Sequence, residues 1–206
     1  HFLNGLALSG KKTGDGFVIA TQADGQFYAR KLIFATGISD IFPDIKGFAE
    51  CWGISVIHCP YCHGYEFRGK QTGILANGER AFHITSLVNN LTDRITVLTS
   101  GKAAFNTEQV AKLNNRGIGI IETPVSEIIH ENGHLKKVVL GDGQQLDFDA
   151  VYAAIPFTQH SDIPVSLGCE LTENGHLKVD TMQKTTVNGV FACGDNRSEE
   201  RRVGKE

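Results

Sequence analysis

The sequence has few cysteines, no long apolar run and no strong excess of charge, and each absence excludes a class of protein. Five cysteines in 206 residues are too few for the disulfide framework of a small secreted domain. No apolar run approaches the roughly 18 residues that a membrane-spanning helix needs, so we expect no membrane association. The formal net charge of −3 gives no electrostatic reason to expect nucleic-acid binding.

The composition is otherwise that of an ordinary globular chain, long enough for one large domain or two small ones. The two ends are unusual. The chain begins with His1 instead of Met and opens inside a strand-like pattern, with no signal peptide ahead of it. Residues 197–206 lack apolar periodicity, and we interpret them as a non-native tail, a natural polar terminus being the alternative. We therefore expect a fragment of a longer protein.

Strand and helix patterns alternate along the middle of the chain. Strands are expected at residues 7–10, 17–21, 26–30, 31–37, 73–76, 95–98, 118–121, 148–155, 177–179 and 189–193, with a hairpin within residues 125–140. Helices are expected at residues 79–90 and 107–115. The run at residues 31–37 is apolar without alternation, which is typical of a buried parallel strand. This order predicts an α/β fold with a doubly wound parallel sheet.

The most informative stretch is His58-Cys59-Pro60-Tyr61-Cys62-His63. Two cysteines separated by two residues suit a reversible dithiol/disulfide couple in a reducing compartment, which favours a cytoplasmic protein. The flanking histidines can exchange protons at neutral pH. A zinc site is the first alternative, but ligands so crowded in sequence make poor tetrahedral geometry, and we expect no metal. An inert structural pair is the second alternative.

Two further motifs lie where predicted strands end. Thr36-Gly37 follows the strand at residues 31–37, and Gly194-Asp195 follows the last predicted strand. A glycine at a strand end lets the backbone approach a cofactor, and an aspartate after it can accept a hydrogen bond from a sugar or polyol hydroxyl. Each motif is weak alone, and their order relative to the cysteine pair makes the combination specific.

The chain resembles the low-molecular-weight thioredoxin reductases, a family of FAD-dependent pyridine nucleotide-disulfide oxidoreductases. The motifs that carry the resemblance are Ala35-Thr36-Gly37, Cys59-Pro60-Tyr61-Cys62, Phe67-Arg68-Gly69-Lys70 and Gly189 to Asp195. The resemblance implies a split FAD-binding Rossmann-like domain with an inserted NAD(P)-binding domain that carries the cysteines. The FAD domain would comprise residues 1–53 and 156–196, and the inserted domain residues 54–155.

The resemblance also assigns roles to residues. Cys62 would lie against the flavin and form the charge-transfer thiolate, while Cys59 would attack an external disulfide. Asp195, beside Gly194, would bind the ribityl chain of FAD, and Thr36 and Gly37 would line the FAD site. The family's first FAD-binding unit and its C-terminal helix are absent, so we expect these 206 residues alone to be inactive.

The chain departs from the family at several positions. His63 stands where the family has an aspartate, so His63, with His58 nearby, is the expected proton donor and acceptor. The fingerprint G-x-G-x-x-A is present only in Gly78 and Ala81, because Ala76 replaces its first glycine. An alanine there can crowd the turn that admits a pyrophosphate, which leaves NADPH uncertain and FAD unaffected.

The leading hypothesis is a disulfide oxidoreductase that passes electrons between NAD(P)H, FAD and Cys59–Cys62 to reduce a thioredoxin-like protein or a small disulfide. The alternative, suggested by the Cys-His-Gly form of the motif, is an FAD- and oxygen-dependent oxidase of a small dithiol. A third hypothesis is a non-enzymatic zinc or redox-sensing module. A homodimer follows from the resemblance alone. Three cysteines, Cys51, Cys169 and Cys193, are expected to be packed or incidental, and Trp52 to pack at a linker between domains.

Overall fold

The computed structural model describes residues 2–23 and 25–197, which fall into two compact units. Unit 1 is formed by residues 1–41 and 157–206, and unit 2 by residues 42–156. Residues 42–53, which the sequence analysis placed with the FAD domain, therefore fall in unit 2. The expected non-native tail, residues 197–206, lies outside the described residues except for Arg197.

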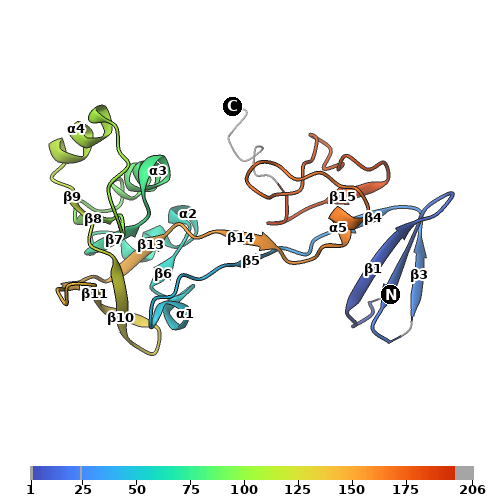
Figure 1. Cartoon of the computed structure of the whole chain (residues 1–206), viewed down its shortest axis with the longest axis horizontal. Helices are drawn as coiled ribbons and strands as arrows, with labels where there is room; N and C mark the ends of the chain where they lie inside the picture. The colour runs from blue at the N-terminus through green and yellow to red at the C-terminus, as the bar shows by residue number, and fades with distance from the viewer. Residues whose placement is uncertain (1, 24, 198–206) are drawn as a thin grey trace. The chain divides into compact units, whose positions relative to one another are not determined.

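A five-stranded parallel sheet forms the centre of unit 2 (Figure 1). Its strands, in spatial order, are β6 (Val56–Ile57), β13 (Ala150–Ala153), β7 (Thr72–Leu75), β8 (Ile95–Leu98) and β9 (Gly119–Ile121). Successive strand residues point to opposite faces, so each strand supplies two separate hydrophobic clusters.

Helices cover one face of this sheet. They are α3 (Gly78–Val88) and α4 (Thr107–Asn115), whose bounds lie within two residues of the predicted ones. The cluster beneath them joins strand residues to helix residues and contains Ile57, Ile74, Val97, Tyr152, Ala81, Ile84, Val88 and Leu113. Ala81, a member of the expected fingerprint, is fully buried here and lets α3 pack closely.

An antiparallel sheet covers the other face. Its strands are β10 (Val125–Glu131), β11 (His134–Leu140) and β12 (Gln145–Asp147), with the short helix α1 (Phe48–Cys51) beside β10. The cluster on this side contains Phe48, Leu98, Ile128, Val138, Leu140, Phe148 and Val151. The α/β fold with a parallel sheet is as predicted, and its second face carries strands where a doubly wound domain has helices.

Unit 1 contains three small sheets. They are the antiparallel β1 (Ala7–Lys12), β2 (Phe17–Thr21) and β3 (Gln26–Ala29); the parallel pair β4 (Leu32–Phe34) and β15 (Val190–Ala192); and the antiparallel pair β5 (Ile38–Asp40) and β14 (Phe157–Gln159). The short helix α5 (Ile163–Ser166) packs on β1. Its core contains Phe17, Phe34, Ile163, Cys169, Leu177, Val190 and Ala192.

The strand predicted to be buried at residues 31–37 is only partly buried. Phe34 is buried, but Ile33 keeps 71% of its surface exposed. The physical reason is that β4 pairs with β15 alone, so one edge and one face of this sheet have no further strand against them among the described residues.

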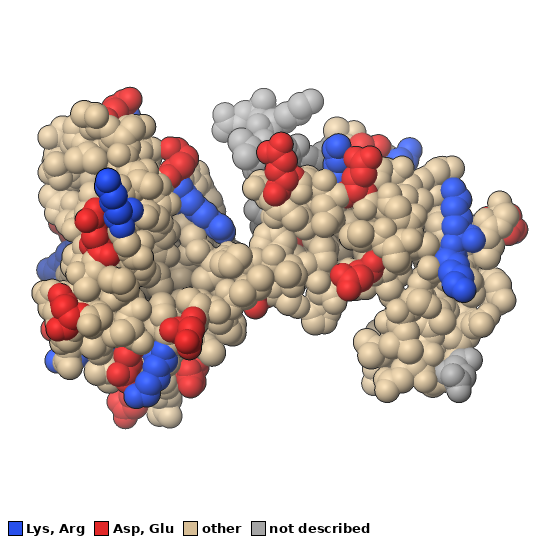
Figure 2. Space-filling model, viewed as in Figure 1, with Lys and Arg blue, Asp and Glu red and all other residues tan. Residues whose placement is uncertain are grey.

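Acidic and basic side chains are interspersed over unit 2, and they do not gather by sign on the face that Figure 2 shows. Within residues 2–23 and 25–197, no helix is long and apolar enough to cross a membrane.

Candidate active site

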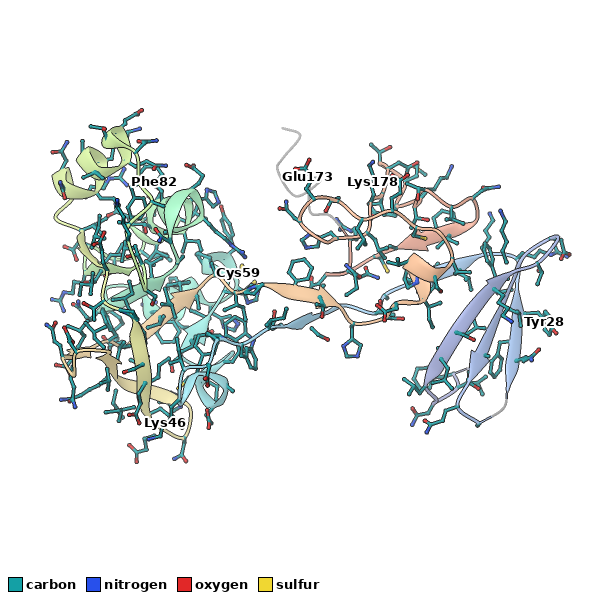
Figure 3. All side chains as sticks on the ribbon, viewed as in Figure 1. Tyr28, Lys46, Cys59, Phe82, Glu173 and Lys178 are labelled. Carbon is teal, nitrogen blue, oxygen red and sulfur yellow. The ribbon has the colours of Figure 1, made fainter. Side chains whose placement is uncertain are left out.

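The two cysteines of the C-x-x-C motif lie side by side at the surface of unit 2. Cys59 precedes the short helix α2 (Pro60–His63), and the one turn of helix returns Cys62 to it. The Cys62 thiol donates to the Cys59 Sγ across 3.0 Å, and the two sulfurs are not joined in a disulfide. A small approach of the two sulfurs would bring them to the 2.05 Å of a disulfide. Cys62 is exposed and Cys59, labelled in Figure 3, is half-buried.

The two flanking histidines have different surroundings. The His63 Nδ1 lies 3.7 Å from the Glu66 Oε2, in the 3-10 turn η1 (Gly64–Phe67) that follows α2. This neighbour orients the imidazole one residue from Cys62, which suits proton exchange at the pair. His58 is exposed, and its ring stacks on Trp52 with 6.0 Å between centroids. Trp52, expected to pack at a linker, thus also supports the residue beside Cys59.

A residue that the sequence analysis did not single out, Tyr152, lies beneath this loop. Tyr152 on β13 pairs in register with Ile57, two residues before Cys59, and is only 1% exposed. Burial, followed by the nearby charges of Cys59 and Glu66, raises the pKa of Tyr152 to about 12. Its hydroxyl therefore stays protonated and neutral under the redox pair at physiological pH.

Gly64 brings the loop this close to Tyr152. A Cβ at Gly64 would meet the Leu91 Cδ1 and lie 3.3 Å from the Tyr152 hydroxyl. No local pattern in the sequence marks Tyr152 or Gly64 as neighbours of the cysteines, because strand pairing brings them together over a long separation.

The remaining cysteines have other surroundings. Cys51 and Cys169 are buried, and burial raises the pKa of both thiols, which keeps them protonated and unreactive. Cys193 is exposed at the end of β15. Over the described part of the chain, no three His, Cys, Asp or Glu side chains are grouped so as to hold a metal ion.

The expected flavin residues of unit 1 come together where β4 and β15 end. These neighbouring strands are parallel, with Phe34 opposite Ala192, so Thr36 and Gly194 follow at the same edge. Asn196, which the sequence analysis missed, joins the two strand ends. Its Nδ2 donates to the Phe34 carbonyl at 3.1 Å and to the Thr36 Oγ1 at 3.2 Å.

This strand end fits a polyol-bearing cofactor such as FAD. Gly37 and Gly194 have φ angles of 69° and 78°, and no atom of the described residues lies within 4 Å of where a Cβ would stand at either. The Oδ1 of Asn196 is buried without a hydrogen-bond donor. Asp195 is exposed beside it. Open backbone, a free buried acceptor and a carboxylate are what a ribityl hydroxyl chain needs, since hydroxyls donate to both oxygens.

The expected nucleotide residues of unit 2 lie at the carboxyl end of β7. Gly78 is the first residue of α3 and has a φ of 60°, which favours glycine. Ala76 is not among the positions with positive φ, so the alanine that replaces the family's glycine fits without backbone strain. Whether the Ala76 methyl group crowds a bound pyrophosphate stays a prediction. The Asn77 side chain bonds to the Gly78 N–H and to the loop after β8. While the Asn77 side chain makes these bonds, it occupies the Gly78 N–H, and the residues present do not fit a pyrophosphate.

Fold and site together define a class: a two-unit α/β protein with a surface dithiol on a nucleotide-type parallel sheet. Residues 8–204 match the pyridine nucleotide-disulphide oxidoreductase family, and the chain belongs to this family. Such membership implies FAD and NADPH as cofactors, and relatives of the chain carry the name thioredoxin reductase.

The chain is similar to the thioredoxin reductase tcpT of Claviceps purpurea, with 33% identity over 198 residues that cover 92% of this chain and 62% of that protein. It is also 33% identical to the thioredoxin reductase sirT of Leptosphaeria maculans, over 95% of this chain and 64% of that one. The crystal structure of the oxidoreductase from Agrobacterium tumefaciens superposes with a TM-score of 0.86 at 31% identity, covering 99% of this chain and 68% of that one. The chain thus spans a little under two thirds of these curated relatives.

Proposed function

We propose that the full-length protein is a flavin-dependent disulfide oxidoreductase in which electrons pass between NAD(P)H, FAD and the Cys59–Cys62 pair. The substrate we propose is the disulfide of a thioredoxin-like protein or of a small molecule. The single observation that carries the proposal is the 3.0 Å separation of the Cys59 and Cys62 sulfurs at the surface of unit 2. The relatives' names support the reductase direction and do not favour the dithiol oxidase alternative.

The exchange step follows from the chemistry of the pair. The Cys59 thiolate attacks one sulfur of the external disulfide, forms a mixed disulfide and releases the first substrate thiolate. The Cys62 thiolate then attacks the Cys59 sulfur, closes the Cys59–Cys62 disulfide and releases the second substrate thiolate. Two electrons leave the pair for the substrate, and the two protons of the cysteine thiols end on the two released thiolates. We assign the transfer of these protons to His63, whose Nδ1 lies 3.7 Å from the Glu66 Oε2.

Bound FAD, once reduced by NAD(P)H, would supply the two electrons that restore the dithiol. The residues that would hold it in this chain are Thr36, Gly37, Gly194 and Asp195, and their role is to bind and orient the ribityl chain. We also propose a cytoplasmic location, because a C-x-x-C pair cycles as a dithiol in a reducing compartment.

The first experiment is an anaerobic titration of the full-length protein with NADPH while flavin absorbance is recorded. Bleaching near one equivalent supports the proposal. Failure to bleach with NADPH or NADH, together with bleaching by a dithiol and recovery in air, would favour the oxidase alternative.

The second experiment replaces Cys59 by serine. We expect Cys59→Ser to lower disulfide reduction by at least about 1,000-fold, because the attacking thiolate is lost. Cys193→Ser, which removes an exposed cysteine of unit 1 outside the C-x-x-C motif, is the matched control and should keep most of the activity. Equal losses in the two variants would contradict the assignment.

A further inference from the structure

The loop between β7 and α3 is the place where a nucleotide-binding fold normally receives a pyrophosphate. The first N–H groups of the helix have no intrahelical partners, so they are free to bind an anion there. In this chain the first of these groups is already bonded. The Gly78 N–H donates to the Asn77 Oδ1 at 2.8 Å.

Asn77 also bonds to a second loop, the one that follows β8. Its Oδ1 accepts from the Ala104 N–H at 2.9 Å, and its Nδ2 donates to the Lys102 carbonyl at 2.9 Å. One side-chain amide therefore joins the loops after two adjacent parallel strands. A dinucleotide lies across this edge of the sheet in folds of this kind.

Two further groups near the amide already have partners within the chain. The Ala103 N–H donates to the Glu122 Oε1 at 2.7 Å, so a further backbone donor of this loop is bonded within the chain. Glu79, in the first turn of α3, accepts from the Gln109 Nε2 at 2.5 Å and adds a negative charge near the helix N-terminus. A negative charge there is favourable to the helix but unfavourable to a neighbouring phosphate.

We infer that Asn77 is a latch on the nucleotide site, whose side chain occupies the position of the pyrophosphate and must leave before NADPH binds. Asn77 stands at the variable position between the first two glycines of the fingerprint, so the residue at this position decides whether a side chain bonds to the loop after β8. The inference rests on the proposed function for the identity of the nucleotide. It makes Asn77 a residue that sets the affinity for NADPH, with no part in the disulfide exchange itself.

The test replaces Asn77 by glycine in the full-length protein and measures the Kd of NADPH and of 2′,5′-ADP by calorimetry. We expect both ligands to bind at least 10-fold more tightly to Asn77→Gly than to the wild type. Asn77→Ser is the second variant, because its shorter side chain can still cap Gly78 but cannot reach the loop after β8. It should bind more tightly than the wild type and less tightly than Asn77→Gly.

The matched control is Asn106→Gly. Asn106 is the N-cap of the neighbouring helix α4, and its Oδ1 accepts from the Gln109 N–H at 2.9 Å. This variant loses a helix cap of the same kind and should leave the Kd of NADPH within about twofold. A fourth variant, Asn77→Asp, keeps both bonds to the Oδ1 position and adds a negative charge, so it should bind NADPH more weakly than the wild type.

Unchanged affinity in both Asn77→Gly and Asn77→Ser would overturn the latch, as would equal tightening in Asn106→Gly. Thiol–disulfide exchange by Cys59 and Cys62, measured with a chromogenic disulfide on the same samples, separates this failure from that of the proposed function. Exchange that stays intact while NADPH affinity does not move rejects the latch alone. Absent exchange rejects the proposed function.

Discussion

Two pairs of adjacent parallel strands end in glycine-containing loops, β4 and β15 in unit 1 and β7 and β8 in unit 2. At the first pair an asparagine, Asn196, binds one strand end to the other and leaves its Oδ1 free and buried. At the second pair an asparagine, Asn77, uses its Oδ1 for two backbone donors. The same residue type thus leaves one strand end ready for a ligand and closes the other. A glycine pattern therefore locates a candidate cofactor site at a strand end. The bonds of the neighbouring asparagine decide whether its Oδ1 is available to a ligand.

The largest expected effect comes from filling the strand end of β4 and β15 with a side chain. Gly194→Val places a β-branched side chain at a φ of 78° where we propose that the backbone meets the cofactor. We expect the full-length protein to bind FAD about 10- to 100-fold more weakly, because the close approach is lost and the backbone is strained by about 1–3 kcal/mol. Flavin content after purification and the Kd of FAD for the apoprotein measure this effect.

Gly69→Val is the control for Gly194→Val. Gly69 has a φ of 67° and equally open space around its missing Cβ, but it lies in a turn of unit 2 that precedes β7 and belongs to neither strand end. It should lose similar stability and keep its flavin. Equal flavin loss in both variants would show that strain, and not access to the cofactor, is being measured.

A second prediction concerns Tyr152 in unit 2. Its contribution to the unfolding free energy can be measured without changing either strand end. The folded pKa of about 12 lies above the ordinary value near 10, so the buried neutral hydroxyl stabilises the fold fully below pH 10. This contribution is lost as the pH rises from about 10 to 12. We expect the wild type to lose about 1–3 kcal/mol more of its unfolding free energy across this window than Tyr152→Phe. Urea unfolding of both proteins at pH 9 and pH 11.5 gives the difference, and parallel losses would contradict it.

The smallest expected effect distinguishes two proposed causes of weak nucleotide binding at the end of β7. These are crowding by Ala76 and the bonds of Asn77. Ala76→Gly restores the first glycine of the fingerprint but leaves Asn77 in place. We expect the Kd of NADPH to change by less than about threefold, since Ala76 has no positive φ to relieve, while stability falls by up to about 1 kcal/mol. If Ala76→Gly tightened binding as much as Asn77→Gly, crowding of the turn would be the cause and the latch would be unnecessary.

Much of unit 2 was predictable because its elements have strong local periodicity. The strand Ile95–Leu98 and the helix Thr107–Asn115 have the bounds that the sequence predicts. The elements that were missed are short and depend on distant partners. β6 has two residues and forms because it pairs with β13, almost a hundred positions later, and β5 forms only against β14. No window of sequence around Val56 or Ile38 carries that information.

The candidate site divides in the same way. Cys59, Cys62 and His63 are visible in the sequence because their spacing is local. Thr36 and Gly194 were brought together in prediction only through the resemblance to a family. Tyr152 and Asn77 were not predicted as parts of a site, since a tyrosine in a strand and an asparagine before a helix are common. Only the register of β13 with β6, and the hydrogen bonds of Asn77, give these two residues their place.

The packing of Gly64 has a consequence for engineering. Because its missing side chain leaves room for Leu91 and the Tyr152 hydroxyl, the redox loop is fitted to the strand and helix beneath it. A four-residue C-x-x-C grafted onto another scaffold would carry the sulfurs without the packing of Gly64 against Leu91 and Tyr152. The transferable unit is the hexapeptide Cys59 to Gly64 together with a cavity shaped for it. If only the cysteines are copied, we expect the distance between the two sulfurs to vary.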